Sequence, residues 1–187
     1  MKYSVEKLIQ EGIERKKEDY VFFWGHRKTK KISKSCFSQW YEIDFEVDGH
    51  KYNCAEQYMM SQKAWVFKDL ETFGKILDAT DPKEIKALGR QVKNFDGKKW
   101  NEHKFEIVKK GNLAKFGDNA ELKEFLLSTG NKIIVEASPY DNIWGIGMKD
   151  ITPGIENPSN WRGQNLLGFA LMEVRDILRK NSLKEEC

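Results

Sequence analysis

The chain of 187 residues has few cysteines and histidines. Its cysteines, Cys36, Cys54 and Cys187, are odd in number and scattered, and they form no C-x-x-C pair. This pattern argues against a disulfide framework and predicts a reducing, cytoplasmic setting. The three histidines are equally scattered, without the spacing that a structural zinc site needs. We therefore expect no metal.

Long apolar runs and a large charge of one sign are also missing. No apolar stretch approaches the roughly 20 residues that cross a bilayer, so we expect a soluble protein with no membrane contact. Together, 32 Lys and Arg residues against 29 Asp and Glu residues give a net charge of +3. That charge does not by itself indicate a nucleic-acid binder, and it suits a phosphorylated small molecule equally well.

The chain does have clear helical periodicity and abundant aromatic residues, which can fill a core or stack on a heterocycle. The expected helices cover residues 4–19, begin near Ala55, at Asp69 and at Asp81, and cover 96–110, 119–130 and 164–180. The expected strands are 20–24, a hairpin within 42–52 that turns at Asp48 and Gly49, and 132–137. This pattern predicts an α+β fold, mainly helical, with a small sheet.

One main domain is expected over residues 20–180. A helical extension, residues 1–19, precedes it, and a short tail, residues 181–187, follows it. The stretch from Arg27 to Lys34 is rich in Lys and Arg and has no apolar period. It is either a solvated loop or a contact for phosphate or nucleic acid.

Two charged residues, Glu56 and Lys63, fall on a helical stripe that would normally bury hydrocarbon. Seven steps of about 100° return the helix to nearly the same direction, so the two side chains share one face. They form a salt bridge across two turns, extend to solvent at the edge of the core, or line a pocket. In a pocket, a partly desolvated lysine would become a usable amine nucleophile, and the glutamate would move protons.

A second candidate site follows the strand at 132–137. Asp141, Trp144, Gly145 and Gly147 lie on a loop at the end of this strand, where a rigid scaffold positions exposed side chains. The same residues also suit a tight turn with a packed tryptophan. Arg162 precedes the last helix and is either an anion contact or a surface residue beside a helix cap.

Six ordered motifs resemble those of a known family. They are FFWG (22–25), CFSQWY (36–41), CAEQYMMSQKA (54–64), AKFGDN (114–119), IVEASPYDNIWGIG (134–147) and WRGQNLLGFALMEVRDIL (161–178). Their order and spacing over about residues 20–180 are similar to those of the YbiA-like, or NADAR, family. Gln57 is a departure, because many relatives carry histidine after the motif glutamate. Residues 1–19 lie outside the resemblance.

The resemblance implies an N-glycosidase without a cofactor. Family members hydrolyse ribosylamino-pyrimidine phosphates of riboflavin biosynthesis, and related members remove ADP-ribose from guanine in DNA. The implied partner is therefore a ribosylated nucleobase or nucleotide, with ADP-ribosylated DNA as a further substrate. A non-catalytic module that binds ADP-ribose or a nucleotide is the alternative. The oligomeric state stays open.

The resemblance also implies roles for particular residues. The catalytic set is Glu56, Lys63 and Asp141. Lys63 would exchange with the ribosylamine to form a Schiff base, and Glu56 would donate and accept protons. The competing route is direct hydrolysis, with Glu56 or Asp141 activating water or stabilising positive charge. The substrate-binding set is Trp24, Gly25, Arg27, Trp40, Trp144, Gly145, Gly147, Arg162 and Asn165.

Overall fold

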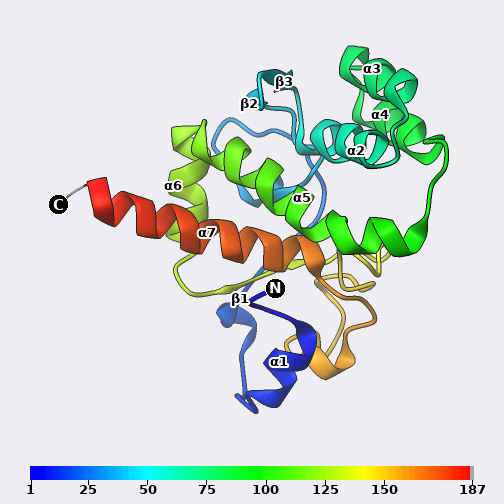
Figure 1. The fold of residues 1–187 in the computed structure, drawn as a ribbon. Coiled ribbons are helices and arrows are strands. Elements are labelled where there is room, and N and C mark those ends of the chain that lie inside the picture. The colour runs from blue at the N-terminus through cyan, green and yellow to red at the C-terminus, as the bar shows by residue number, and fades with distance from the viewer. Residues whose placement is uncertain (186–187) are drawn as a thin grey trace. The chain divides into compact units, whose positions relative to one another are not determined.

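A computed structural model describes residues 1–185, which fall into two compact units (Figure 1). The first unit contains residues 1–38 and the chain from residue 121 onward, and the second contains residues 39–120. The elements of the first unit are α1 (Val5–Gln10), η1 (Lys17–Asp19), β1 (Tyr20–Phe23), η2 (Lys34–Phe37), α6 (Ala120–Ser128), β4 (Ile133–Glu136), η3 (Pro158–Asn160) and α7 (Leu166–Glu185). Those of the second are β2 (Phe45–Val47), β3 (His50–Tyr52), α2 (Ala55–Val66), α3 (Leu70–Asp78), α4 (Pro82–Arg90) and α5 (Gly97–Gly117).

The first unit is built around two parallel strands. β1 pairs with β4 in a register that runs from Tyr20 opposite Ile133 to Phe23 opposite Glu136. α7 packs on β4 so closely that a Cβ on Gly168 would lie 2.1 Å from the carbonyl oxygen of Ile134. Because the strands are parallel, their carboxyl ends meet at one edge. The segments that follow β1 and β4 therefore leave the sheet together.

The N-terminal arm, residues 1–19, is less helical than expected. The predicted helix over 4–19 is wrong beyond Gln10, where α1 ends. Ser4 caps its start, because the side chain of Ser4 accepts a hydrogen bond from the backbone N–H of Lys7 at 3.2 Å. Gly12 then takes a φ of +62°, a left-handed conformation that stops a helix.

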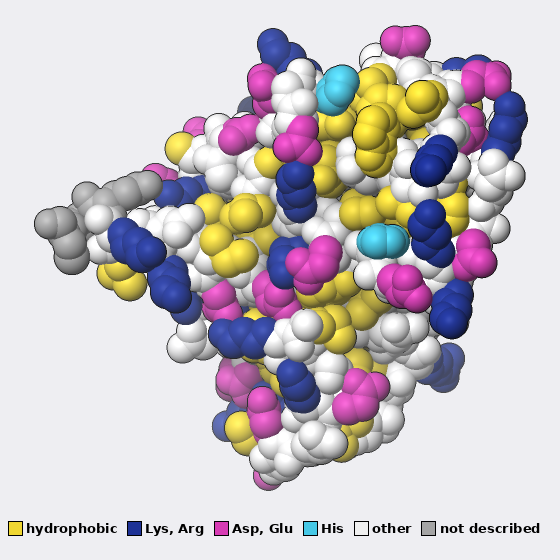
Figure 2. Space-filling model, viewed as in Figure 1, with side chains coloured by type: hydrophobic (Ala, Val, Ile, Leu, Met, Phe, Trp, Pro, Cys, Tyr) yellow, Lys and Arg dark blue, Asp and Glu magenta, His cyan; other side chains and the backbone are white. Residues whose placement is uncertain are grey.

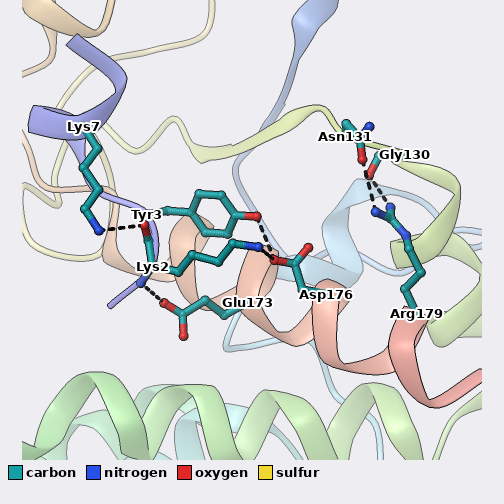
Figure 3. Close-up of polar contacts among 8 residues, drawn as sticks. All are labelled: Lys2, Tyr3, Lys7, Gly130, Asn131, Glu173, Asp176 and Arg179. Carbon is teal, nitrogen blue, oxygen red and sulfur yellow. Dashed lines mark hydrogen bonds and ion pairs between the residues drawn. The ribbon is translucent and has the colours of Figure 1, made fainter. Parts of the chain in front are cut away.

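Polar contacts tie the arm to α7 (Figure 3). Lys2 and the hydroxyl of Tyr3 both donate to the carboxylate of Asp176, and the backbone N–H of Lys2 donates to Glu173. Burial alone would raise the pKa of Asp176, but the bonds from Lys2 and Tyr3 outweigh it and hold this pKa below its ordinary value of 3.8. The arm is thus docked by an ionised carboxylate.

The second unit begins with the expected hairpin. β2 and β3 pair antiparallel, with Asp48 at φ 52° and Gly49 at φ 79° in the turn, and these two positive φ values are those of a type I′ turn. The inward-facing side chains of the hairpin form a cluster with the first residues of α2. This cluster consists of Phe45, Val47, Tyr52, Ala55 and Tyr58.

The helix starts predicted at aspartates are confirmed. Asp69, Asp81 and Asp96 each accept a hydrogen bond from a backbone N–H in the first turn of α3, α4 and α5. Two helices continue beyond their predicted ends, because α5 reaches Gly117 and α7 reaches Glu185. Most of the expected tail over 181–187 is thus helix, and its last two residues lie outside the described ones.

α2, α3 and α4 pack together in the second unit (Figure 1). α2 and α4 approach closely at Gly89, where an added Cβ would lie 2.0 Å from the sulfur of Met60. Gly111 on α5 likewise leaves room for the ring of Tyr58, because an added Cβ would lie 2.3 Å from this ring. Two glycines therefore let the neighbouring helices come into contact with α2.

No helix within residues 1–185 is long and apolar enough to cross a membrane. On the face drawn in Figure 2, Lys and Arg side chains lie among Asp and Glu side chains and do not gather into one block. That mixture agrees with the small net charge of +3.

The docking of the arm should depend on pH. A carboxylate whose pKa is lowered by folding stabilises the folded state above the unfolded value, and this stabilisation is lost as the pH falls through the folded pKa. We expect α1 amides to be protected from hydrogen exchange at neutral pH, and their protection factors, which correct for the pH dependence of the intrinsic exchange rate, to fall below about pH 4. Asp176→Asn should lower these protection factors already at neutral pH. If neither acid pH nor Asp176→Asn changes the protection of the α1 amides, Asp176 does not anchor the arm.

The contact at Gly89 can be tested with a matched pair of glycines. Gly89→Ala should lower the free energy of unfolding by about 1–3 kcal/mol, because Met60 must move aside. Gly74 lies inside α3, where an added Cβ would have no atom within 4 Å, so Gly74→Ala should raise stability by up to about 1 kcal/mol. Urea denaturation measures both, and equal effects would contradict the close contact.

Candidate functional site

Glu56 and Lys63 both lie on α2, as predicted. Glu56 is in the first turn and only 3 % exposed, and its backbone N–H donates to the carbonyl oxygen of Gln39 at 2.9 Å. Lys63 lies two turns further along and is half-buried. The negative charge of Glu56 raises the pKa of Lys63, so the two groups interact electrostatically. Buried charges of this kind are costly unless they are compensated.

The amine of Lys63 lies at the C-terminal end of α4. Its Nζ donates to the carbonyl oxygen of Gly89 at 2.7 Å and lies 4.3 Å from the centre of the Phe95 ring. Burial lowers the pKa of Lys63 from its ordinary value of 10.5, Glu56 opposes this, and the positive charge of Arg90 adds to the lowering. Because the net effect lowers this pKa, a larger fraction of Lys63 is the neutral, nucleophilic amine than in an exposed lysine.

Cys54, just before α2, is the other nucleophile nearby. It is fully buried, and burial raises the pKa of its thiol to about 11. A thiol needs its thiolate form to attack, so Cys54 is inert at neutral pH. This leaves Lys63 as the better nucleophile of this helix.

Trp40 belongs to the same unit and is half-buried. The Nζ of Lys86 lies 5.5 Å from the centre of its ring. This distance permits a cation–π contact, so one face of the indole carries a positive charge. Gln57, where a histidine stands in many relatives, instead holds α3: its side chain donates to the carbonyl oxygens of Ile76, Leu77 and Ala79.

The remaining predicted residues belong to the first unit, where Asp141 organises the loop after β4. Its Oδ1 accepts hydrogen bonds from the backbone N–H groups of Ile143 and Trp144, each at 2.8 Å. Its carbonyl oxygen accepts from the N–H of Gly147 at 3.0 Å. Asp141 therefore holds the turn that presents Trp144. A catalytic role for its carboxylate stays a prediction.

Asn165 and two glycines give this loop its shape. Asn165 is fully buried, donates to the carbonyl oxygen of Ile134 at 2.9 Å, and accepts from the N–H of Glu136 at 3.0 Å. A Cβ on Gly145 would lie 2.8 Å from the carbonyl oxygen of Glu136, and Gly147 has a φ of +66°. The structure accounts for these three residues by loop packing, and their contact with substrate stays a prediction.

Exposed aromatic residues lie at the same edge of the first unit. Trp24 directly follows β1, is 55 % exposed, and its ring centre lies 6.0 Å from that of Tyr140. Two exposed rings in contact form a surface on which a base can stack. Gly25 turns the chain with a φ of +86°, and Arg27 and Arg162 are exposed.

Sequence reasoning missed the residues that surround Lys63. Gly89, Arg90 and Phe95 belong to α4 and the segment after it, and none lies in the motifs that drew attention to α2. A glycine inside a helical pattern is a signal of close packing, and it could have identified Gly89. The described residues contain no group of three His, Cys, Asp or Glu side chains that could hold a metal ion.

Comparison with known proteins identifies relatives along most of the chain. The model of the NADAR domain matches residues 22–179. The protein named N-glycosidase R617, from Acanthamoeba polyphaga mimivirus, is 46% identical over 165 residues, which are 85% of this chain and 96% of that protein. N-glycosidase YbiA from Shigella flexneri is 31% identical over 142 residues, 76% of this chain and 80% of that protein.

A solved structure is also similar. The NMR structure of the E. coli protein YbiA has a TM-score of 0.72 and 27% sequence identity, over 88% of this chain and 87% of that one. This likeness confirms the predicted α+β, mainly helical fold. The matches together confirm the resemblance found in the six motifs.

The electrostatic link between Glu56 and Lys63 can be measured. Removing the negative charge with Glu56→Gln should lower the pKa of Lys63 further, because the opposing effect of Glu56 is lost. The pKa can be followed by NMR after reductive ¹³C-methylation of the lysines. Glu71→Gln, which removes an exposed carboxylate paired with Lys75 and Lys93, should leave Lys63 unchanged. A pKa of Lys63 that rises or stays constant in Glu56→Gln would refute the link.

Proposed function

Because the chain belongs to the NADAR domain family, we propose that it is an N-glycosidase, a hydrolase that cleaves the bond between a ribose and an exocyclic nitrogen of a base. Relatives that carry the name N-glycosidase support this proposal over most of the chain's length. The substrate is a ribosylamino-pyrimidine phosphate or an ADP-ribosylated guanine, both of which carry this bond.

The environment of Lys63 is the observation that carries the proposal. In the part of the chain that the structure describes, its single hydrogen bond goes to a backbone carbonyl, and no carboxylate forms an ion pair with it. Its pKa is lowered by burial, and a buried carboxylate, Glu56, lies within electrostatic reach. A half-buried amine beside a buried acid suits imine chemistry better than structural support.

The reaction begins with the sugar. In the reacting form, Glu56 holds the proton of the pair and Lys63 is the neutral amine. Protonation of the ring oxygen by Glu56 breaks the bond between this oxygen and C1, and leaves a positively charged iminium between C1 and the nitrogen of the base. The neutral amine of Lys63 adds to C1, and a proton passes to the nitrogen of the base. The bond between C1 and the base then breaks, so that the base leaves with its amino group and C1 stays bound to Lys63 as an iminium.

Hydrolysis completes the cycle. Water adds to C1 of the iminium, with Glu56 as the base that accepts its proton. The bond between C1 and Nζ then breaks, and the sugar leaves as an open-chain aldehyde that closes to its ring form. Lys63 returns as an amine and Glu56 as an acid. Glu56 gives one proton to the ring oxygen and takes one back from water, and the other proton transfers run between the nitrogen of Lys63, the base and the sugar, so the cycle balances without a cofactor.

Direct hydrolysis is the competing route. There, Glu56 or Asp141 would activate water while positive charge develops at C1, and Lys63 would only stabilise the bound substrate. The Oδ1 of Asp141 accepts two backbone hydrogen bonds from its own loop, which supports a structural role for this residue. We therefore place the acid–base work on Glu56.

Base recognition falls to the aromatic residues. In the unit that holds Lys63, Trp40 offers a ring that a flat heterocycle can stack on, and such a stack suits both substrate classes. Stacking on Trp24 or Trp144 stays a prediction of the family resemblance. The small net charge favours neither a small phosphorylated substrate nor a long polyanion.

Turnover of two substrates tests the proposal. The protein is incubated with a ribosylamino-pyrimidine phosphate and, separately, with DNA that carries ADP-ribosyl-guanine, and the released sugar is identified by mass. We expect release from at least one, and at least a hundredfold loss of kcat in Lys63→Ala and in Glu56→Gln. Lys75→Ala, which changes an exposed lysine on α3, should retain activity.

The outcomes separate the alternatives. Full activity in both site variants would show that the assigned residues are wrong. Tight binding of ADP-ribose without any release, unaffected by Lys63→Ala, would show a binding module in place of an enzyme. Thermal melting of each variant distinguishes loss of activity from loss of the fold.

A further inference from the structure

The C-terminal half of α4 carries two cations beside Lys63. Lys86 and Arg90 are four residues apart, so they lie on the same face of the helix. Gly89, between them, provides the carbonyl oxygen that the Nζ of Lys63 binds at 2.7 Å. Two cations, Lys86 and Arg90, therefore flank the carbonyl group that Lys63 binds, and the charge of Arg90 acts on Lys63.

Among the described residues, neither Lys86 nor Arg90 is neutralised by an acid, whereas Lys63 interacts with Glu56. In residues 1–185, neither Lys86 nor Arg90 forms an ion pair, and the Nζ of Lys86 lies 5.5 Å from the centre of the Trp40 ring. Other cations of the same unit are paired: Lys75 and Lys93 both bind Glu71, and Lys110 binds Asp48 at 2.6 Å. Lys86 and Arg90 carry like charges and have no ion-pair partner among the described residues, so a bound anion would relieve their repulsion.

We propose that Arg90 and Lys86 form the subsite for the phosphate on C5 of the substrate's ribose, an inference that rests on the proposed function. Lys63 would attack C1 of this ribose, and the phosphate is attached at the other side of the same small sugar. A cation next to the contact of Lys63 is therefore within reach of the phosphate. The exposed guanidinium of Arg90 offers the planar pair of donors that phosphate oxygens accept.

Lys86 and Trp40 complete the subsite. The half-buried ammonium of Lys86 supplies a second positive charge whose position the Trp40 ring restricts. The influence of Arg90 on the pKa of Lys63 shows that the two side chains share one electrostatic field. A phosphomonoester and the diphosphate of ADP-ribose present the same oxygen chemistry, so both sources fit the subsite.

The first experiment compares two substrates in Arg90→Gln. One is a ribosylamino-pyrimidine 5′-phosphate, and the other is the same compound without its phosphate. We expect kcat/KM for the phosphorylated substrate to fall about 10- to 100-fold, and kcat/KM for the other to change less than about twofold. Lys93→Gln is the matched control, because this exposed cation is paired with Glu71 and should alter neither value.

The second experiment measures binding without catalysis. Ribose 5-phosphate, ADP-ribose and unphosphorylated ribose are titrated into the intact protein by ³¹P or ¹H NMR. Arg90→Gln should weaken whichever phosphorylated ligand binds by about 10- to 100-fold, and the stronger of the two identifies the phosphate source. Equal binding in the wild type and Arg90→Gln would overturn the subsite.

The two experiments distinguish failure of the subsite from failure of the proposed function. If the protein hydrolyses its substrate but Arg162→Gln or Arg27→Gln removes the preference for phosphate while Arg90→Gln does not, the subsite is wrong and the function stands. If ribose 5-phosphate binds in an Arg90-dependent way but nothing is hydrolysed, the subsite stands and the function fails.

Discussion

The arrangement around Lys63 depends on the close contact of α2 with α4 at Gly89. Any side chain at this position would meet Met60, which would have to move aside. With the helices in contact, the amine of Lys63 reaches the Gly89 carbonyl and loses part of its hydration, and the charge of Arg90 acts on it. Desolvation and a like charge favour the neutral amine. The absence of a side chain at Gly89 thus permits the helix contact in which the pKa of Lys63 is lowered.

In the first unit, polar side chains fix the loop after β4, which has no regular secondary structure. The segment after β4 is held by the carboxylate of Asp141 on one side and by the buried amide of Asn165 on the other. Because these polar groups satisfy backbone donors and acceptors, the loop can be rigid although it contains no helix or strand. Residues that a motif marks as functional therefore act here first through the shape of the chain.

Local signals allowed much of the fold to be predicted from the sequence. The predictable features were the aspartates at helix starts, the Asp48–Gly49 turn and the apolar strands. Each acts on neighbouring backbone atoms, so a short stretch of sequence is enough to predict it. The positions of Glu56 and Lys63 on one helix were predictable for the same reason. Gly12 ended α1 early, and the contacts of Lys63 with Gly89 and Phe95 join segments far apart in the chain. Periodicity carries no information on such contacts, and the motifs did not include these residues.

A covalent intermediate on Lys63 is the central claim, and borohydride trapping tests it most directly. The intact protein is mixed with its substrate and sodium borohydride, which reduces an iminium to a stable amine, and is then digested and analysed by mass spectrometry. We expect one reduced sugar phosphate per chain, on the peptide that contains Lys63, and none on that of Lys68. Continued release of the base with no adduct, or an adduct on another lysine, would contradict the Schiff base on Lys63.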